Sequence, residues 1–219
     1  MKRLIFLILL MLPMLFLTAW SSSYEEITDV KNFSQNVNSY IGKDLTHRRL
    51  IPITDQSHLN MEYDSHYFAP WDRREPGHPK KDAEWSFQEF RNQTGYDETK
   101  KEWKSEWVDK IEANANLDAF PNKRLRVITI HNTSLRMLPT HKPFFYNFDL
   151  EGEGYPFDNF QHSALPAGTP IFVSHISKDG AWSLAETHYG LGWTPSEDLA
   201  YVTRDFIKLW KNGRYATSI

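Results

Sequence analysis

The 219-residue chain contains no cysteine. This absence excludes disulfide bonds, cysteine-ligated metals and a cysteine nucleophile within the printed sequence. The chain also lacks a basic excess, with 25 Lys and Arg against 28 Asp and Glu and a formal net charge of −3. Nucleic-acid-binding proteins normally present a concentrated basic face, so we expect no nucleic-acid partner.

Several motifs of metal and nucleophilic chemistry are also missing. The nine histidines form no His-x-His or His-Glu-x-x-His pattern, and there is no Gly-x-Ser-x-Gly elbow or phosphate-binding glycine loop. His58, Glu62 and His66 are spaced at i, i+4 and i+8, which would place them on one face of a helix. Their tyrosine-rich, proline-bounded surroundings favour a loop instead, so we predict no metal and no cofactor.

Long hydrophobic runs are absent except at the start, where Leu4 to Ala19 follow Lys2 and Arg3. This pattern is typical of a secretory signal, and we expect residues 1–21 to be a signal peptide cleaved after Ser21. The body of the protein is then exported to the periplasm or cell envelope. Trp20 stands where a lipoprotein signal needs cysteine, which excludes lipid anchoring there. If the signal is not cleaved, it remains as an N-terminal membrane anchor.

The remaining sequence has enough apolar residues for a core, with 40% hydrophobic and 15% aromatic residues. Its first half predicts helices and loops. Val30 to Leu45 has weak helical periodicity, and prolines and a glycine between residues 61 and 82 predict a loop. Ala83 to Asn92 predicts a short helix, although its Trp85/Phe87 alternation leaves a strand open.

A clearer helix is predicted from Thr99 to Asn116. Thr99 and Glu102 are spaced as a capping box, in which the two side chains satisfy free N–H groups at a helix start. Trp103, Trp107 and Ile111 then form a stripe along one helical face. We expect this stripe to pack on the core rather than serve as a ligand platform.

The second half predicts short strands separated by turns. Strands are expected at 124–130, 169–174, 181–186 and 198–202. Lys178-Asp-Gly180 is expected to form a turn. The segment Gly192-Trp-Thr-Pro195 precedes the last strand. Several short strands within about 80 residues favour a small barrel. The expected fold class is therefore α+β, with an irregular, partly helical N-terminal domain followed by a small all-β SH3-like barrel.

The strand half resembles a bacterial SH3 domain. The resemblance rests on the order of "TIHNTSLRMLPT" (129–140), "LPAGTPIFV" (165–173), "SKDGAWSLAE" (177–186) and "GWTPSEDLAYV" (192–202). A 24-residue insertion at 141–164 looks like the first SH3 domain (SH3b1 type) of NlpC-type cell-wall peptidases. "YFAPW" (67–71) and the aromatic helices look like the N-terminal stabilising clip of those enzymes.

The resemblance implies a domain order. A signal peptide (1–21) precedes the clip (25–121), the SH3b1-type domain with its long loop (122–203), and the start of a truncated second SH3 domain (204–219). A papain-like domain supplies the catalytic Cys–His pair in the family. Since this chain has no cysteine, we expect no catalytic residues and no cleavage of stem peptides by it alone.

The function implied is that of the non-catalytic, substrate-shaping and targeting portion of a peptidoglycan stem-peptide endopeptidase. Its expected partners are peptidoglycan stem peptides and a peptidase catalytic domain, in the same polypeptide or another chain. The alternative is a free-standing periplasmic SH3 module that binds peptidoglycan or a protein. A third interpretation is an enzyme that uses the loop carboxylates Glu151, Glu153 and Asp158 as a glycosidase does.

We predict a substrate-binding site in the long loop, made of Glu153, Tyr155, Phe157 and Asp158. Aromatic side chains provide contact area for a peptide, and carboxylates attract the amines that stem peptides carry. The resemblance implies that this loop faces the substrate cleft. Alternatively, the aromatic residues only fill space beneath the loop. Trp182 and Trp193 are expected in the core or in a groove wall.

Overall fold

The computed structural model describes residues 31–41 and 51–213, which fall into two units, residues 1–53 and 54–219. In the described part of the first unit, the 3-10 turn η1 (Val37–Ser39) begins where the Asn36 side chain accepts a hydrogen bond from the Asn38 N–H at 3.0 Å. Residues 33–36 are not helical, so the helix expected over Val30–Leu45 is wrong there. The predicted signal peptide and residues 42–45 lie outside the described residues.

The second unit begins with two helices, α3 (Ile53–Tyr67) and α4 (Ala69–Asp72). Our expectation of a loop over residues 61–82 is therefore wrong for most of residues 61–72, and also for residues 80–82, which are helical. Pro70 is at the start of α4, where the missing N–H of proline costs no helical hydrogen bond. Residues 73–79, with Pro76, Gly77 and Pro79, do form an irregular connection.

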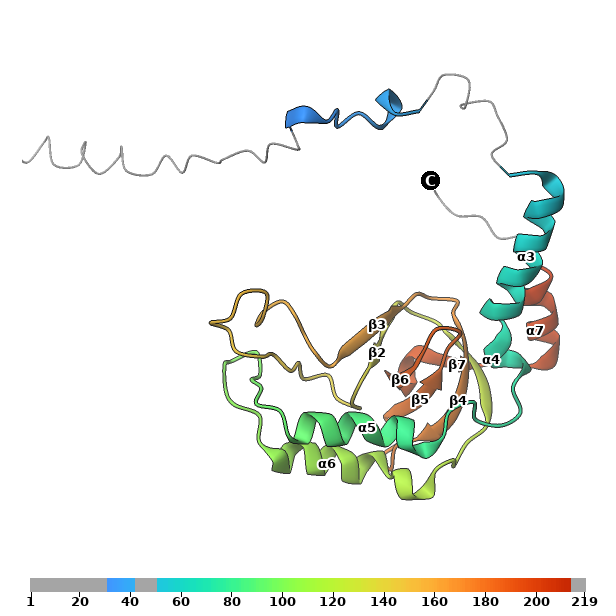
Figure 1. The fold of residues 1–219 in the computed structure, drawn as a ribbon. Coiled ribbons are helices and arrows are strands. Elements are labelled where there is room, and N and C mark those ends of the chain that lie inside the picture. The colour runs from blue at the N-terminus through green and yellow to red at the C-terminus, as the bar shows by residue number, and fades with distance from the viewer. Residues whose placement is uncertain (1–30, 42–50, 214–219) are drawn as a thin grey trace, which may run out of the picture. The chain divides into compact units, whose positions relative to one another are not determined.

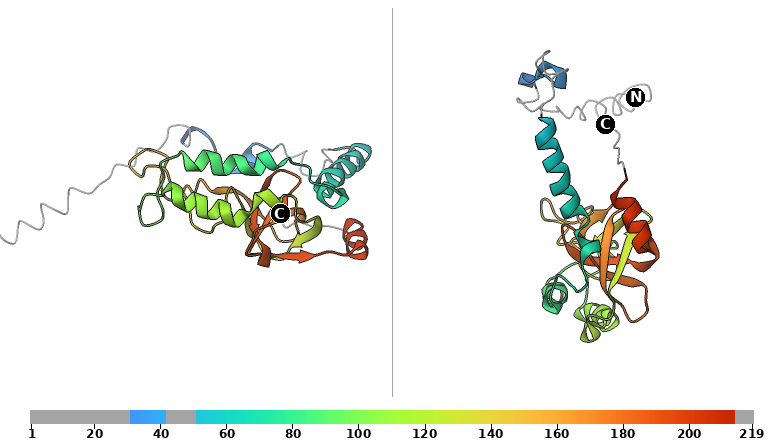
Figure 2. Two further views of the ribbon diagram at one scale, coloured as in Figure 1. Left: turned by 90° about the horizontal axis from the view of Figure 1, so that it is seen from below. Right: turned by 90° about the vertical axis from the view of Figure 1, so that its right-hand side faces the viewer.

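Helix α5 (Lys80–Arg91) confirms the helix predicted over Ala83–Asn92, and the strand alternative is wrong. Its buried residues are Ala83, Ser86, Phe87 and Phe90, which recur at helical spacing on one face. Helix α6 (Ser105–Ala115) packs beside α5, as both views in Figure 2 make visible. Trp103, Trp107 and Ile111 pack into the shared core, as the stripe predicted.

The start of α6 differs from the prediction, because residues 99–102 do not cap a helix. The Asp97 carboxylate accepts hydrogen bonds from the Thr99 N–H at 2.8 Å, the Thr99 hydroxyl at 2.6 Å and the Lys101 N–H at 3.0 Å. These bonds hold a turn, since the aspartate offers the backbone an alternative to helix. The expected helix therefore starts six residues late, at Ser105.

The described residues then form one antiparallel seven-stranded sheet with the order β3-β2-β6-β5-β4-β1-β7. Figure 1 shows this sheet beside α5 and α6. The strands are β1 (Leu125–Thr129), β2 (Thr133–Arg136), β3 (Gln161–Leu165), β4 (Pro170–Ile176), β5 (Trp182–Glu186), β6 (Leu191–Pro195) and β7 (Leu199–Tyr201). β1, β4, β5 and β7 confirm the four predicted strands, and the whole arrangement confirms the α+β class, whereas β2, β3 and β6 were not predicted from the local pattern. Short 3-10 turns, η3 (Leu117–Ala119) and η4 (Ser196–Asp198), precede β1 and β7.

The central strand β5 is buried along its whole length because it has a core on both faces. Trp182 and Leu184 join the core formed with α5 and α6, and Ala185 joins a second core inside the sheet. Trp193 of β6 is also buried in the first core, which confirms the core interpretation for both tryptophans. This arrangement ties the helical segment to the sheet through one shared core.

Helix α7 (Arg204–Lys211) follows β7, over residues expected to begin a second SH3 domain. Phe206 and Trp210 pack against Phe68 and Trp71 of the α4 region. The Trp71 indole N–H donates to the Val127 carbonyl at 2.8 Å, which fixes this corner to β1. Across residues 31–41 and 51–213, no helix is both long and apolar enough to cross a membrane.

Candidate functional site

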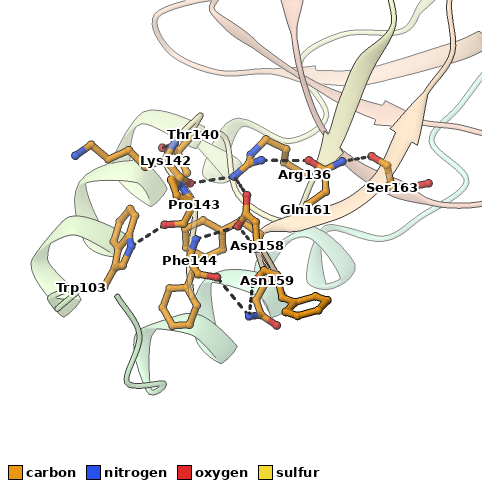
Figure 3. Close-up of polar contacts among 12 residues, drawn as sticks. Trp103, Arg136, Thr140, Lys142, Pro143, Phe144, Asp158, Asn159, Gln161 and Ser163 are labelled. Atoms are coloured by element: carbon orange, nitrogen blue, oxygen red, sulfur yellow. Dashed lines mark hydrogen bonds and ion pairs between the residues drawn. The ribbon is translucent and has the colours of Figure 1, made fainter. Parts of the chain in front are cut away.

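The predicted site lies in the long loop that connects β2 to β3, residues 137–160. Its two ends meet at a buried polar network around Arg136, the last residue of β2 (Figure 3). The Arg136 guanidinium donates to the Asp158 carboxylate at 2.9 Å, to the Lys142 carbonyl at 2.9 Å and to the Gln161 amide oxygen at 3.2 Å. One side chain thus holds two points of the loop and the start of β3.

Asp158 completes this clamp from the other end of the loop. While one of its oxygens faces Arg136, the other accepts hydrogen bonds from the Phe144 and Phe160 N–H groups, both at 2.9 Å. The side chain of Arg136 is 6% exposed and that of Asp158 is 19% exposed. Burial makes such charge-assisted hydrogen bonds strong, because water competes for them poorly.

An aromatic cluster lies beneath the clamp. The rings of Phe144 and Phe160 come from the loop, Phe90 comes from α5, and Trp103 precedes α6. Ring centroids are 4.8 Å apart for Phe90 and Phe160, and 5.3 Å apart for Trp103 and Phe160. The Trp103 indole N–H also donates to the Pro143 carbonyl at 2.9 Å (Figure 3). The base of the loop is therefore part of the core.

The loop is also paired with the chain between α5 and α6. The Tyr96 N–H donates to the Phe145 carbonyl at 2.7 Å, and the Phe145 N–H donates to the Tyr96 carbonyl at 2.8 Å. Gly95 stands directly over Phe144, where a Cβ atom would lie 2.0 Å from the ring. A glycine is required there because the backbone approaches the ring so closely.

The tip of the loop, residues 149–157, is by contrast open to solvent. Tyr155 is 78% exposed, Leu150 57% and Phe157 55%. Tyr155 lies edge-on to the buried Phe145, with ring centroids 6.2 Å apart. Two of the predicted site residues, Tyr155 and Phe157, are thus large aromatic side chains displayed on a tip whose base is fixed.

Three carboxylates accompany these rings: Asp149, Glu151 and Glu153. None of them forms an ion pair with another of the described residues. Burial, reinforced by Glu89 and Glu153, raises the pKa of Tyr146, so this phenol stays uncharged beside them. The tip therefore combines carboxylates that are in no ion pair among the described residues with exposed apolar surface, which suits an amine-bearing ligand with an apolar part.

The four predicted site residues separate into two groups. Glu153, Tyr155 and Phe157 belong to the tip, whereas both oxygens of Asp158 are engaged within the clamp. Sequence reasoning missed the role of Arg136, although the "SLR" that ends β2 was part of the SH3-like pattern. It also missed Phe160, whose side chain is fully buried beneath the loop.

The histidine series behaves differently from its expected loop, because His58, Glu62 and His66 all lie on helix α3. The loop assignment was therefore wrong, because the prolines that suggested a loop begin only at Pro70, after α3 has ended. Among the described residues, no group of three His, Cys, Asp or Glu side chains is arranged to hold a metal ion. We assign no metal-binding role to this series.

The sequence matches two protein families, and the matches follow the two halves of the fold. Residues 9–120 match the NLPC_P60 stabilising domain, N term, and residues 143–195 match an SH3 domain of the SH3b1 type. The chain belongs to the NlpC/P60 stabilising-domain family. No curated protein gives a significant match.

A solved structure supports this relationship. A novel NlpC/P60 endopeptidase from Photobacterium damselae subsp. piscicida is 31% identical, with a TM-score of 0.77 and coverage of 82% of this chain. The match spans only 43% of the length of that endopeptidase. The chain is thus an NlpC/P60 peptidase-related protein with a stabilising domain and an SH3b1-type domain.

Proposed function

We propose that this chain is the non-catalytic, substrate-shaping and targeting portion of a peptidoglycan stem-peptide endopeptidase. The observation that carries the proposal is the loop tip, where Tyr155, Phe157 and three carboxylates project from the clamped loop of an SH3b1-type domain. The catalytic Cys–His pair comes from a peptidase domain outside the printed sequence. The proposed setting is the periplasm or cell envelope.

The chemistry of the tip supports recognition of a peptide end. A stem peptide carries an ammonium group at a free N-terminus or on its diamino acid. Glu153 and its neighbouring acids attract that charge, while Tyr155 and Phe157 provide apolar contact area. Because Arg136 and Asp158 fix the base of the loop, the tip loses little conformational entropy when a ligand binds.

The clamp also limits which side chains serve as ligand contacts. Asp158 already accepts hydrogen bonds from three donors, so its role in the proposal is to position Tyr155 and Phe157. Direct ligand contact is assigned to Glu153, Tyr155 and Phe157. This division gives different expectations for substitutions at the base and at the tip.

Co-sedimentation with purified peptidoglycan sacculi tests the proposal. We expect the chain to be retained at physiological salt and the double variant Y155A/F157A to lose most of that retention. Y201A is the matched control, because Tyr201 on β7 is 73% exposed and lies outside the loop. Far-UV circular dichroism on each variant verifies that the fold is intact.

The outcomes distinguish the proposal from its alternatives. Retention that is equal for Y155A/F157A and Y201A would remove the tip from wall recognition. Absence of retention for the folded wild-type chain would overturn targeting by this portion. Release of soluble muropeptides by the chain alone, measured by chromatography, would favour an enzyme that uses the loop carboxylates.

A further inference from the structure

A second candidate site lies away from the loop tip, in a pocket between α5 and the sheet. The pocket has a volume of about 170 Å³. Leu184 and Trp193, each only 1% exposed, form its buried wall, and Met137, His162 and Leu191 complete that side. An apolar cavity of about 150 Å³ accommodates a benzene-sized group, so this pocket has room for one side chain.

The outer part of the pocket has a different character. Trp85 and Asp82 of α5 line it, and both reach solvent: Trp85 is 52% exposed and the Asp82 side chain is 39% exposed. The same two residues line a shallow depression on the adjoining surface. A carboxylate and an indole ring at one opening are the two groups that attract an ammonium ion.

Trp85 differs from its neighbours on α5 because its indole ring is exposed to solvent. Its neighbours on α5, Ala83, Ser86 and Phe87, are buried against the core, whereas the indole ring of Trp85 remains half in water. The wall also contains a polar group without a partner. The Trp193 indole N–H is buried and has no hydrogen-bond acceptor among the described residues. A ligand that contacts this wall changes the surroundings of that N–H group.

We propose that this pocket binds a primary ammonium group carried on a short alkyl chain, as in a lysine-type diamino acid side chain. The alkyl chain lies against Leu184 and Trp193, and the ammonium group meets Asp82 and the face of Trp85. This site shares no residue with the loop tip and does not depend on the function proposed for it. It would give the chain a separate affinity for diamino-acid side chains.

A histidine and a lysine of the protein lie near the same carboxylate. The His78 Nδ1 atom is 3.3 Å from an Asp82 oxygen, and Lys81 lines the adjoining depression. Neither lines the pocket itself. A bound ammonium group would therefore share Asp82 with His78, which limits the affinity to that of a weak, reversible site.

The test uses Nα-acetyl-lysine methylamide as the probe and Nα-acetyl-norleucine methylamide as its uncharged counterpart. Both are titrated into the full chain, and the indole N–H signals of Trp193 and Trp85 are followed by ¹H–¹⁵N NMR. We expect the lysine probe to shift both signals and the norleucine probe to bind about five- to tenfold more weakly. The spectra of W193F and W85F assign the two signals.

Variants separate the charge from the cavity. D82N should weaken the lysine probe about two- to fivefold and leave the norleucine probe unchanged. D205N is the matched control, because Asp205 occupies the first turn of α7 as Asp82 does in α5. Y155A should leave both probes unaffected, which keeps this test independent of the loop tip.

Two results would overturn the proposal. Equal binding of the two probes, with no effect of D82N, would remove the ammonium group from recognition. Unchanged Trp193 and Trp85 signals at about 10 mM lysine probe, where even a millimolar site fills, would remove the site altogether.

Discussion

The clamp between Arg136 and Asp158 gives the sharpest prediction for stability. Replacing Asp158 with alanine removes the ion pair and leaves the Phe144 and Phe160 N–H groups without their acceptor. Removing one partner of a buried pair costs about 3–5 kcal/mol. Because about a fifth of the Asp158 side chain is exposed, water reaches part of the vacated site. We therefore expect D158A to lower the free energy of unfolding by about 3 kcal/mol.

Urea unfolding followed by tryptophan fluorescence measures this loss. With an m value of about 2 kcal/mol/M, D158A should lower the midpoint by about 1.5 M. D158N should lose less, about 1–2 kcal/mol, since its amide oxygen still accepts the backbone N–H bonds. D118A is the control: the Asp118 side chain is fully exposed, and its ion pair with Lys80 lies in solvent, so its midpoint should move far less than that of D158A. A D158A midpoint equal to the wild-type value would refute the clamp.

Three further predictions concern other parts of the fold. G95A should cost about 1–3 kcal/mol in urea unfolding, because its Cβ would overlap Phe144, whereas G190A, whose Cβ would lie 3.4 Å from its nearest neighbour in His162, should cost less; equal losses would contradict the close packing. Burial lowers the pKa of His175, and this effect outweighs the hydrogen bond to the Ala115 carbonyl, which raises the pKa. The unfolded chain therefore binds more protons than the folded chain, and the free energy of unfolding falls as the pH drops below about 6.5. H175Q should flatten this pH dependence in thermal unfolding at pH 5–7, and an unchanged slope would argue against a neutral buried imidazole. T203A should cost about 1 kcal/mol, since the Thr203 hydroxyl oxygen caps α7 at the Phe206 N–H, and T203S should restore it; equal stability of T203A and wild type would contradict the cap.

Much of the fold could be predicted because the strands carry local signals. Alternating β-branched residues and glycine turns located β1, β4 and β5, and the buried face of α5 follows helical spacing. The start of α6 could not be predicted in this way. Thr99 and Glu102 match a capping pattern, but in the structure the Asp97 carboxylate accepts the hydrogen bonds of Thr99 and forms a turn. The spacing of these residues does not determine whether the cap or the turn forms.

The candidate site was predicted only in part, because local sequence indicates which residues are exposed but not which residues pair across the fold. Exposed aromatic and acidic residues in a long insertion identify a tip, and Tyr155 and Phe157 are indeed exposed. Which acid pairs with a distant arginine is a tertiary property, so the assignment of Asp158 to Arg136 could not be derived from local sequence. The helical state of His58 to His66 was missed because prolines further along the chain suggested a loop.

The central claim is that the loop tip recognises the amine-bearing end of a wall peptide. The most direct measurement is an NMR titration of the chain with a soluble stem peptide whose N-terminal and diamino-acid amines are both free, compared with the same peptide acetylated at both amines. We predict that backbone amide shifts concentrate on residues 149–157 and that acetylation weakens them strongly. Shifts that avoid this segment, or that are the same for both peptides, would contradict the claim.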